Sequence, residues 1–150
     1  MKRRVYLDTT VPSAHFDDRA PDRQHLTKQF WVERLPEFLP VISSLVLLEI
    51  RDTPDDARRK QMQDLVSDFD VLPFDLPSDE LAQDYVKRGV FPEKYVTDAN
   101  HVAVAATNGI GYIVSWNFAH LVKVQTKRGV NLVHALMGYE PIEIIAPPEL

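Results

Sequence analysis

Short apolar stretches alternate with helix-like stretches along the whole chain, and this alternation is what most constrains the fold. Gly111-Tyr112-Ile113-Val114 is short and continuously apolar, which is typical of a central strand in a parallel sheet. Weaker strand-like stretches lie at residues 4–7, 41–42, 69–74 and 142–145. Because parallel strands are joined by crossover helices, the sequence predicts an α/β fold. We expect three α/β/α layers with a mostly parallel central sheet and a Rossmann-like topology.

Local signals mark where the helices begin and end. Pro21-Asp22 opens a helix that Pro36 stops, and Ser43 and Ser44 are candidate N-caps for a helix through Arg51. Further helical stretches are expected from residue 54, at 77–88 and 97–108, and as shorter pieces at 118–122 and 131–139. No repeat or linker interrupts the pattern, so residues 1–150 are expected to form a single domain.

The composition narrows the classes of function. The chain has no cysteine, which excludes disulfides, thiolate catalysis and cysteine-ligated metals, so any metal ligand must be oxygen or imidazole. No apolar run approaches the roughly 20 residues that span a bilayer, and the N-terminal run is too short for a secretory signal. We therefore expect a cytoplasmic protein with no membrane association.

The formal charge of −5 argues against a protein whose main task is to coat nucleic acid. It is compatible with a nuclease, because a carboxylate cluster supplies several of the acids itself. Arg19, Arg23 and Lys28 form a candidate patch for phosphate contact, although such residues more often lie on a solvated helix face.

Four polar residues stand where the surrounding pattern expects apolar ones. A carboxylate in such a place is costly unless its charge is compensated, and one bound cation compensates several at once. The pattern therefore indicates the ligand set of a divalent-metal site. The four residues are Asp8 after Val5-Tyr6-Leu7, Glu49 within Leu45–Ile50, Asp98 after Thr97, and Asn117 after Ser115-Trp116.

Each of these residues also has a structural explanation. Asp8 can cap the turn that follows it, and Asn117 can stabilise a turn of its own. Asp98 lies in the first turn of its helix, where an acid is favoured by the helix dipole. Glu49 is harder to explain in this way, because the residues around it leave no polar helix face.

Four neighbouring residues are candidates for supporting roles. Thr9 and Thr10 can hydrogen-bond a metal-bound water or the local backbone. His101 follows Asp98 at the i+3 position and is either a hydrogen-bond partner of the site or a packing residue, of which the packing role is favoured. His120 could assist the site or face solvent.

The four motifs, in this order and with this spacing, resemble the PIN-domain family of metal-dependent ribonucleases, which includes the VapC-type toxins of bacterial toxin–antitoxin pairs. The resemblance extends from residue 4 to about residue 145. Each motif is short and degenerate, but four in order are fairly specific. The matching stretches are residues 6–11, 44–49, 97–105 and 113–121.

The resemblance implies a PIN-like endoribonuclease that hydrolyses RNA phosphodiester bonds with Mg²⁺ or Mn²⁺. It implies Asp8, Glu49 and Asp98 as catalytic metal ligands, with Asn117 in the fourth position, where many members have an aspartate. An amide removes charge there without removing an oxygen donor, which affects a second metal more than the first. The resemblance further implies a homodimer, with an antitoxin protein as a possible partner.

Two other interpretations stay open. A non-catalytic PIN-like module that binds RNA or serves as a scaffold is motivated by Asn117 and by the negative net charge. An aspartyl-phosphate phosphatase of the haloacid-dehalogenase type also has an aspartate after its first strand. That family requires a second acid two residues later, where this chain has Thr10.

Overall fold

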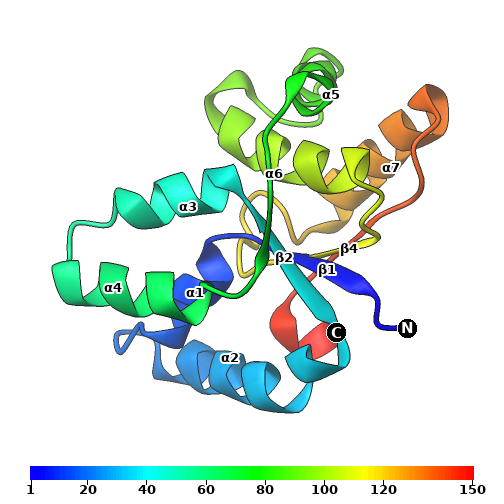
Figure 1. Ribbon diagram of the computed structural model, residues 1–150. Helices are drawn as coiled ribbons and strands as arrows, with labels where there is room; N and C mark the ends of the chain where they lie inside the picture. The colour runs from blue at the N-terminus through cyan, green and yellow to red at the C-terminus, as the bar shows by residue number, and fades with distance from the viewer.

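The computed structural model describes residues 1–150, and a five-stranded sheet forms its centre (Figure 1). The strands are β1 (Arg4–Leu7), β2 (Leu39–Ser43), β3 (Asp70–Leu72), β4 (Tyr112–Val114) and β5 (Glu143–Ile145). Their order in the sheet is β3-β2-β1-β4-β5, and every neighbouring pair is parallel. The predicted parallel sheet is confirmed, and β1 is its central strand.

Seven α-helices connect and cover the strands. They are α1 (Thr10–His15), α2 (Pro21–Glu33), α3 (Ser44–Arg51), α4 (Asp56–Leu65), α5 (Leu76–Lys87), α6 (Val96–Thr107) and α7 (Val124–Met137). Three short 3-10 helices are η1 (Leu35–Glu37), η2 (Glu93–Tyr95) and η3 (Pro147–Glu149). Helices α5 and α6 pack together on one side of the sheet, and α1 and α2 pack together on the other (Figure 1). This is the three-layer α/β/α arrangement that the sequence predicts.

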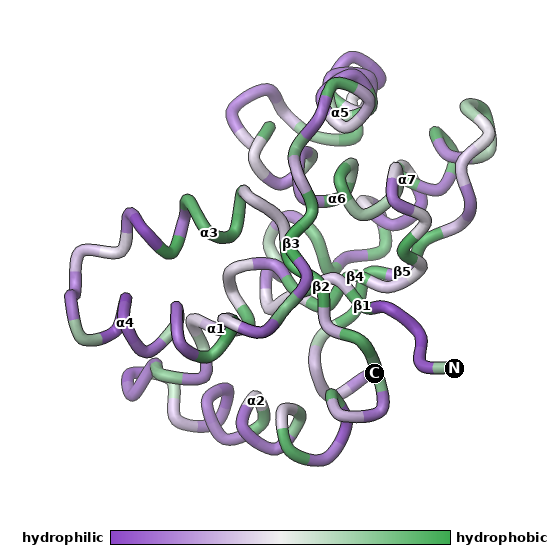
Figure 2. The backbone as a smooth tube through the Cα atoms, in the orientation of Figure 1, coloured by the Kyte–Doolittle hydropathy of each residue, from purple (hydrophilic) through white to green (hydrophobic).

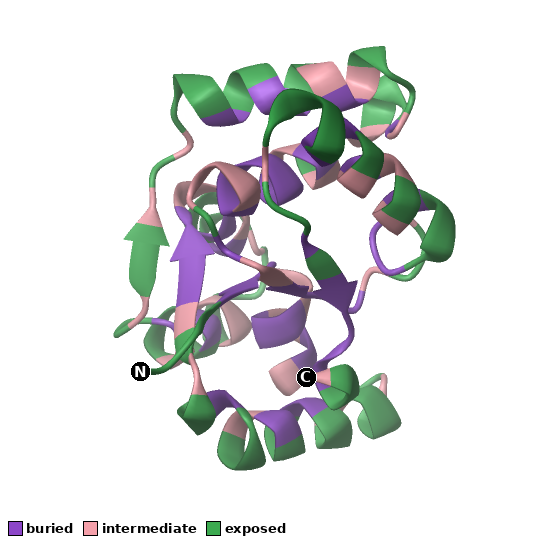
Figure 3. Cartoon of the chain, turned by 90° about the vertical axis from the view of Figure 1, so that its right-hand side faces the viewer, coloured by how far each residue is buried: buried purple, intermediate pink, exposed green.

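The core is built around β1 and its neighbours. Val5, Tyr6 and Leu7 in β1 are completely buried, and so are Ile113 and Val114 in β4 (Figure 3). Figure 2 shows hydrophobic residues concentrated on the strands and α6, whereas α2 and α4 are mainly hydrophilic. Burying one such aliphatic side chain stabilises a fold by about 1.5–3 kcal/mol. The carboxyl ends of β1 and β4 are therefore held in place by the core, which also fixes where the residues that follow them begin.

The helix ends follow the local rules on which the prediction relies. The Ser43 hydroxyl accepts a hydrogen bond from the Leu45 backbone N–H, so Ser43 is the N-cap of α3. Pro21 occupies the first position of α2, where its missing N–H costs no hydrogen bond. Gly138 ends α7 at a φ of 85°, in the left-handed region that favours glycine. None of the helices has the length and apolar character required to cross a membrane.

Two local expectations were wrong, and one helix was not predicted. Residues 118–122 form turns and a bend and not a helix, because the Asn117 side chain accepts the His120 N–H and the Asn117 carbonyl accepts the Val122 N–H in addition to that of Leu121. Helix α7 begins at Val124, seven residues before the expected start at 131. Helix α1 was not predicted; Pro12 lies in its first turn, where proline is tolerated.

Candidate functional site

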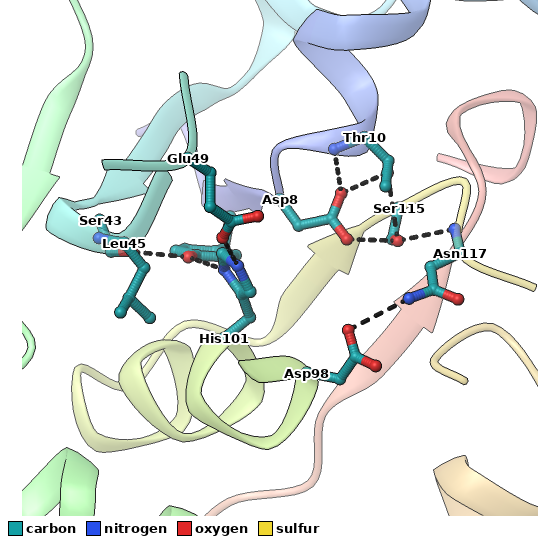
Figure 4. A network of polar contacts seen from close by, with 10 residues as sticks. Asp8, Thr10, Ser43, Leu45, Glu49, Asp98, His101, Ser115 and Asn117 are labelled. Carbon is teal, nitrogen blue, oxygen red and sulfur yellow. Dashed lines mark hydrogen bonds and ion pairs between the residues drawn. The ribbon is translucent and has the colours of Figure 1, made fainter. Parts of the chain in front are cut away.

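The polar residues singled out by the sequence gather where β1 and β4 end (Figure 4). Asp8 follows β1 directly, and Asn117 lies three residues beyond β4. Glu49 reaches the same region from α3, and Asp98 from the first turn of α6. The carboxyl ends of parallel strands are the usual place for a site in such a sheet. The fold therefore brings together side chains that are up to 109 positions apart in the sequence.

Asp8 is held from both sides. Its side chain is buried, and its Oδ1 accepts hydrogen bonds from the backbone N–H and the hydroxyl of Thr10 (3.1 and 2.5 Å). Its Oδ2 accepts a hydrogen bond from the Ser115 hydroxyl (2.5 Å). Thr10, which stands where a phosphatase of the haloacid-dehalogenase type would have its second acid, thus serves to orient Asp8. Both carboxylate oxygens are fixed in direction, yet neither is paired with a lysine or arginine.

Asn117 connects the turn after β4 to α6. Its amide nitrogen donates a hydrogen bond to Oδ1 of Asp98 (3.2 Å), and its amide oxygen accepts one from the backbone N–H of His120 (3.0 Å). Its own backbone N–H donates to the Ser115 hydroxyl (2.9 Å). In this arrangement Asn117 orients Asp98 and closes its own turn. Its role as a direct metal ligand stays a prediction.

Glu49 belongs to a second chain of hydrogen bonds that runs into the core. Nε2 of His101 lies 2.5 Å from Oε1 of Glu49, and Nδ1 of His101 lies 2.6 Å from the hydroxyl of Tyr6. That hydroxyl lies 2.8 Å from the hydroxyl of Ser43, the N-cap of α3. An ionised carboxylate only accepts hydrogen bonds, so with ionised Glu49 the N–H at Nε2 of His101 is the hydrogen-bond donor. The sequence favoured a packing role for His101. In the structure His101 also anchors the Glu49 side chain through this hydrogen bond.

The pKa values of the site residues are shifted because several carboxyl groups lie close to one another and partly out of contact with water. Burial raises the pKa of Asp8, although the charge of His101 and the hydrogen bonds from Ser115 and Thr10 act in the opposite direction. Burial also raises the pKa of Asp98, and the negative charge of Glu49 adds to this, whereas the charges of His120 and His101 and the hydrogen bond from Asn117 act to lower it. For His101, burial acts to lower the pKa, but the hydrogen bond and charge of Glu49, together with Asp8 and Asp98, raise it above its usual value. Burial is thus the largest single cause of the raised pKa of both aspartates.

These residues fit a hard divalent cation in the kind of donor they offer. Glu49 and Asp98 each keep one carboxylate oxygen that accepts no hydrogen bond from the protein, and Asp8 presents a carboxylate already oriented by its neighbours. Oxygen donors of this type suit Mg²⁺ or Mn²⁺. The groups are not drawn into a ready-made cluster, because no three carboxylate or imidazole groups of the chain lie close enough to hold one ion.

The supporting residues differ in their contacts. Thr10 contacts Asp8 directly, whereas the hydroxyl of Thr9 is buried without a hydrogen-bond partner. The ring of His120 packs against that of Tyr95 at a tilt of 30°, with the centroids 3.8 Å apart. Sequence reasoning missed Ser115 and Tyr6 as parts of the site. Ser115 carried a signal, since it is a polar residue at a buried strand end, but Tyr6 inside an apolar strand carried none.

The burial of Asp8 leads to a prediction about pH. A raised pKa means that folded protein binds the Asp8 proton more readily than unfolded protein, whose aspartates titrate near about 3.9. The contribution of Asp8 to the free energy of unfolding therefore falls as pH rises from that value through the folded-state pKa. The Asp8→Asn variant has no carboxyl group to titrate at this position. The free energy of unfolding of the variant, relative to that of the wild type, should therefore increase with pH. Urea denaturation in EDTA across the acid range would measure it, and a stability of Asp8→Asn relative to the wild type that stays constant or falls as pH rises would contradict it.

The comparisons with known proteins concern the family and the fold. A family model described as the PIN domain matches residues 5–117. Among solved structures, the chain is similar to Mycobacterium tuberculosis VapC20, a toxin that cleaves the sarcin–ricin loop, with 18% identity and a TM-score of 0.59 over 93% of this chain and 98% of that one. No curated protein matches the chain.

Two further similar structures come from toxin–antitoxin complexes. VapBC2 from Rickettsia felis, bound to a DNA fragment from its promoter, has 12% identity and a TM-score of 0.55 over 95% of this chain and 98% of that one. VapBC-5 from Mycobacterium tuberculosis, a member of the VapBC family of toxin–antitoxin systems, has 18% identity and a TM-score of 0.52 over the same shares of the two chains. At these identities the similarity establishes the fold alone.

Proposed function

The chain belongs to the PIN domain family, and from this membership we propose that it is a divalent-metal-dependent endoribonuclease that hydrolyses RNA phosphodiester bonds. The observation that carries the proposal is the meeting of Asp8, Glu49 and Asp98 at one edge of the sheet with no lysine or arginine paired to any of them. A cation bound between them, with the three side chains drawn closer together than they lie in the structure, would compensate all three charges.

In this proposal the protein side chains hold and orient, and none acts as a nucleophile. Mg²⁺ or Mn²⁺ held by Asp8, Glu49 and Asp98 would polarise the phosphate and lower the pKa of a bound water. Thr10 and Ser115 fix the direction of the Asp8 carboxylate. Asn117 fixes the direction of the Asp98 carboxylate. An aspartate at position 117 would add negative charge, which the amide lacks. We therefore infer that, of two possible metal positions, the first binds its ion more strongly than the second.

The solved VapBC structures support a toxin–antitoxin setting for this chain. We infer a cytoplasmic toxin that forms a homodimer and is neutralised by an antitoxin protein. Co-expression with the product of the neighbouring open reading frame tests the partner. The expected result is a stable complex in which RNA cleavage is suppressed, and a neighbour that neither binds nor inhibits would oppose this part of the proposal.

A catalytically weak PIN-like module that binds RNA or serves as a scaffold is the second candidate. The side chain of Asn117 favours this candidate, because its amide nitrogen donates a hydrogen bond to Asp98. Asn117 therefore contributes no negative charge to the site. This candidate predicts RNA binding without cleavage at any concentration of Mn²⁺ or Mg²⁺.

Addition of metal separates the two candidates and is expected to have two effects. Purified protein should cleave RNA with Mn²⁺ or Mg²⁺ and stop in EDTA. Metal should also raise the free energy of unfolding, by about 2.7 kcal/mol at a concentration of about 100 times Kd, because it binds the folded state alone. Thermal unfolding with and without metal measures the second effect independently of activity.

A matched variant controls for binding elsewhere on this acidic protein. Glu143→Gln removes an exposed carboxylate at the amino-terminal end of β5, opposite the site, and should leave the metal-induced stabilisation unchanged. Equal stabilisation of the wild type and of Asp98→Asn would place the metal elsewhere. Absence of both metal effects would contradict the proposed enzyme.

A further inference from the structure

An arginine and two aromatic rings lie together immediately beside the acidic site. Trp116 and Phe118 flank Asn117 in the turn after β4, and their rings meet edge to face, with centroids 6.0 Å apart. The guanidinium carbon of Arg23, on the first turn of α2, lies 5.0 Å from the centroid of Trp116 and 5.9 Å from that of Phe118. We call Arg23, Trp116 and Phe118 the aromatic–arginine platform.

The platform is firmly connected to the carboxylates. Trp116 is buried, its indole N–H donates to the Thr27 hydroxyl (2.9 Å), and its backbone N–H donates to the Thr10 hydroxyl (2.8 Å). Thr10 in turn donates to Asp8. On the other side of the turn, Asn117 donates to Asp98. The rings are therefore held at a fixed position relative to two of the proposed metal ligands.

The outer part of the platform is available to a ligand. Phe118 is 47% exposed, which is a large fraction for a phenylalanine. Arg23 is exposed and takes part in none of the seven ion pairs of the chain. A hollow of about 480 Å³ opens between the start of α2 and Trp116, with Arg23 and Asp22 on its wall. The hollow thus adjoins the unpaired guanidinium and Trp116, whose ring meets the exposed ring of Phe118.

We propose that this platform is a nucleotide subsite, in which a base of single-stranded RNA stacks on Phe118 while Arg23 binds a phosphate next to the one that is cleaved. Exposed aromatic rings bind bases of any sequence by stacking, and a guanidinium suits both phosphate and a ring face. Trp116 holds the two in place. The subsite deepens the proposed ribonuclease function, on which it rests, by naming where the substrate strand is held beyond the scissile bond.

Cleavage kinetics test the subsite. Phe118→Ala should raise KM for single-stranded RNA about 5- to 100-fold, as expected for loss of one stacked base, and should change kcat much less. Phe118→Trp should restore a low KM. Arg23→Ala should also raise KM and make it less dependent on salt, because one phosphate contact is lost.

Two matched variants exclude general effects. Arg3→Ala removes the same charge at the amino-terminal end of β1, opposite the site, and Leu132→Ala removes an exposed apolar side chain from α7. Both should leave KM unchanged. A KM that stays constant in Phe118→Ala, or that rises as much in Arg3→Ala as in Arg23→Ala, would overturn the subsite.

A binding experiment separates failure of the subsite from failure of the proposed function. A short RNA that contains the fluorescent base 2-aminopurine is titrated with the protein in EDTA, where metal-dependent cleavage cannot occur. Stacking on Phe118 should quench the fluorescence, and Phe118→Ala should abolish the quenching while Leu132→Ala retains it. If wild-type protein does not cleave RNA, this result alone decides the subsite. Absent quenching, or quenching that survives Phe118→Ala, overturns it.

Discussion

Asp98→Asn is expected to lower metal-dependent RNA cleavage by about 10²- to 10⁴-fold while the protein stays folded. Metal-centred stabilisation of the transition state amounts to several kcal/mol, and each 1.36 kcal/mol corresponds to about a tenfold change in rate. The amide keeps the shape of the side chain but loses the negative charge that would hold a cation. Because burial raises the pKa of Asp98, the charged form gains little from folding, so the neutral amide should not unfold the protein.

Asp98 lies in the first turn of α6, so its alternative role is to stabilise the helix N-terminus, and a control variant can test this. Asp79 occupies the equivalent first turn of α5 and is exposed. Asp79→Asn and Asp98→Asn both lose the favourable interaction with a helix N-terminus, about 0.3–1 kcal/mol. Only Asp98→Asn should lose cleavage. Urea denaturation and single-turnover cleavage of the two variants measure both quantities, and full cleavage by Asp98→Asn would remove this residue from the active site.

His101→Ala is expected to lower the free energy of unfolding by about 2–4 kcal/mol and kcat by about 10- to 100-fold. The substitution leaves a cavity, the buried hydroxyl of Tyr6 loses a partner, and Glu49 loses the hydrogen bond that directs it. The lost orientation of Glu49 accounts for the effect on kcat. His101→Gln, which can still donate to Glu49, should recover part of kcat.

His134 provides a control that is matched in burial and bonding. It is completely buried on α7, its ring contacts the Tyr85 hydroxyl and the Glu140 carbonyl, and it lies outside the network around Glu49. His134→Ala should destabilise the fold by a similar amount but leave cleavage per folded molecule unchanged. If the two alanine variants lower cleavage per folded molecule equally, His101 has a structural role only.

Local sequence signals were sufficient for most of the fold. The continuous apolar character of Tyr112–Val114 indicated a buried parallel strand, and Ser43 and Pro21 marked the helix starts at which they lie. The errors arose where one side chain overrides a local pattern. Asn117 turns the chain at residues 118–122 by accepting the His120 N–H, although the sequence there is compatible with a helix.

The sequence by itself determined most of the elements and the placement of Asp8, Asp98 and Asn117 at or near element ends, because these depend on residues within one or two turns of each other. The alternation of strands and helices along the chain then implied the parallel sheet. The tertiary structure decided which side chains meet. The bonds from His101 to Glu49 and Tyr6, and the position of Arg23 over Trp116, join residues 52, 95 and 93 positions apart. Such pairs depend on how helices pack across the sheet, so no local pattern contains them, and they orient the carboxylates on which the proposed function rests.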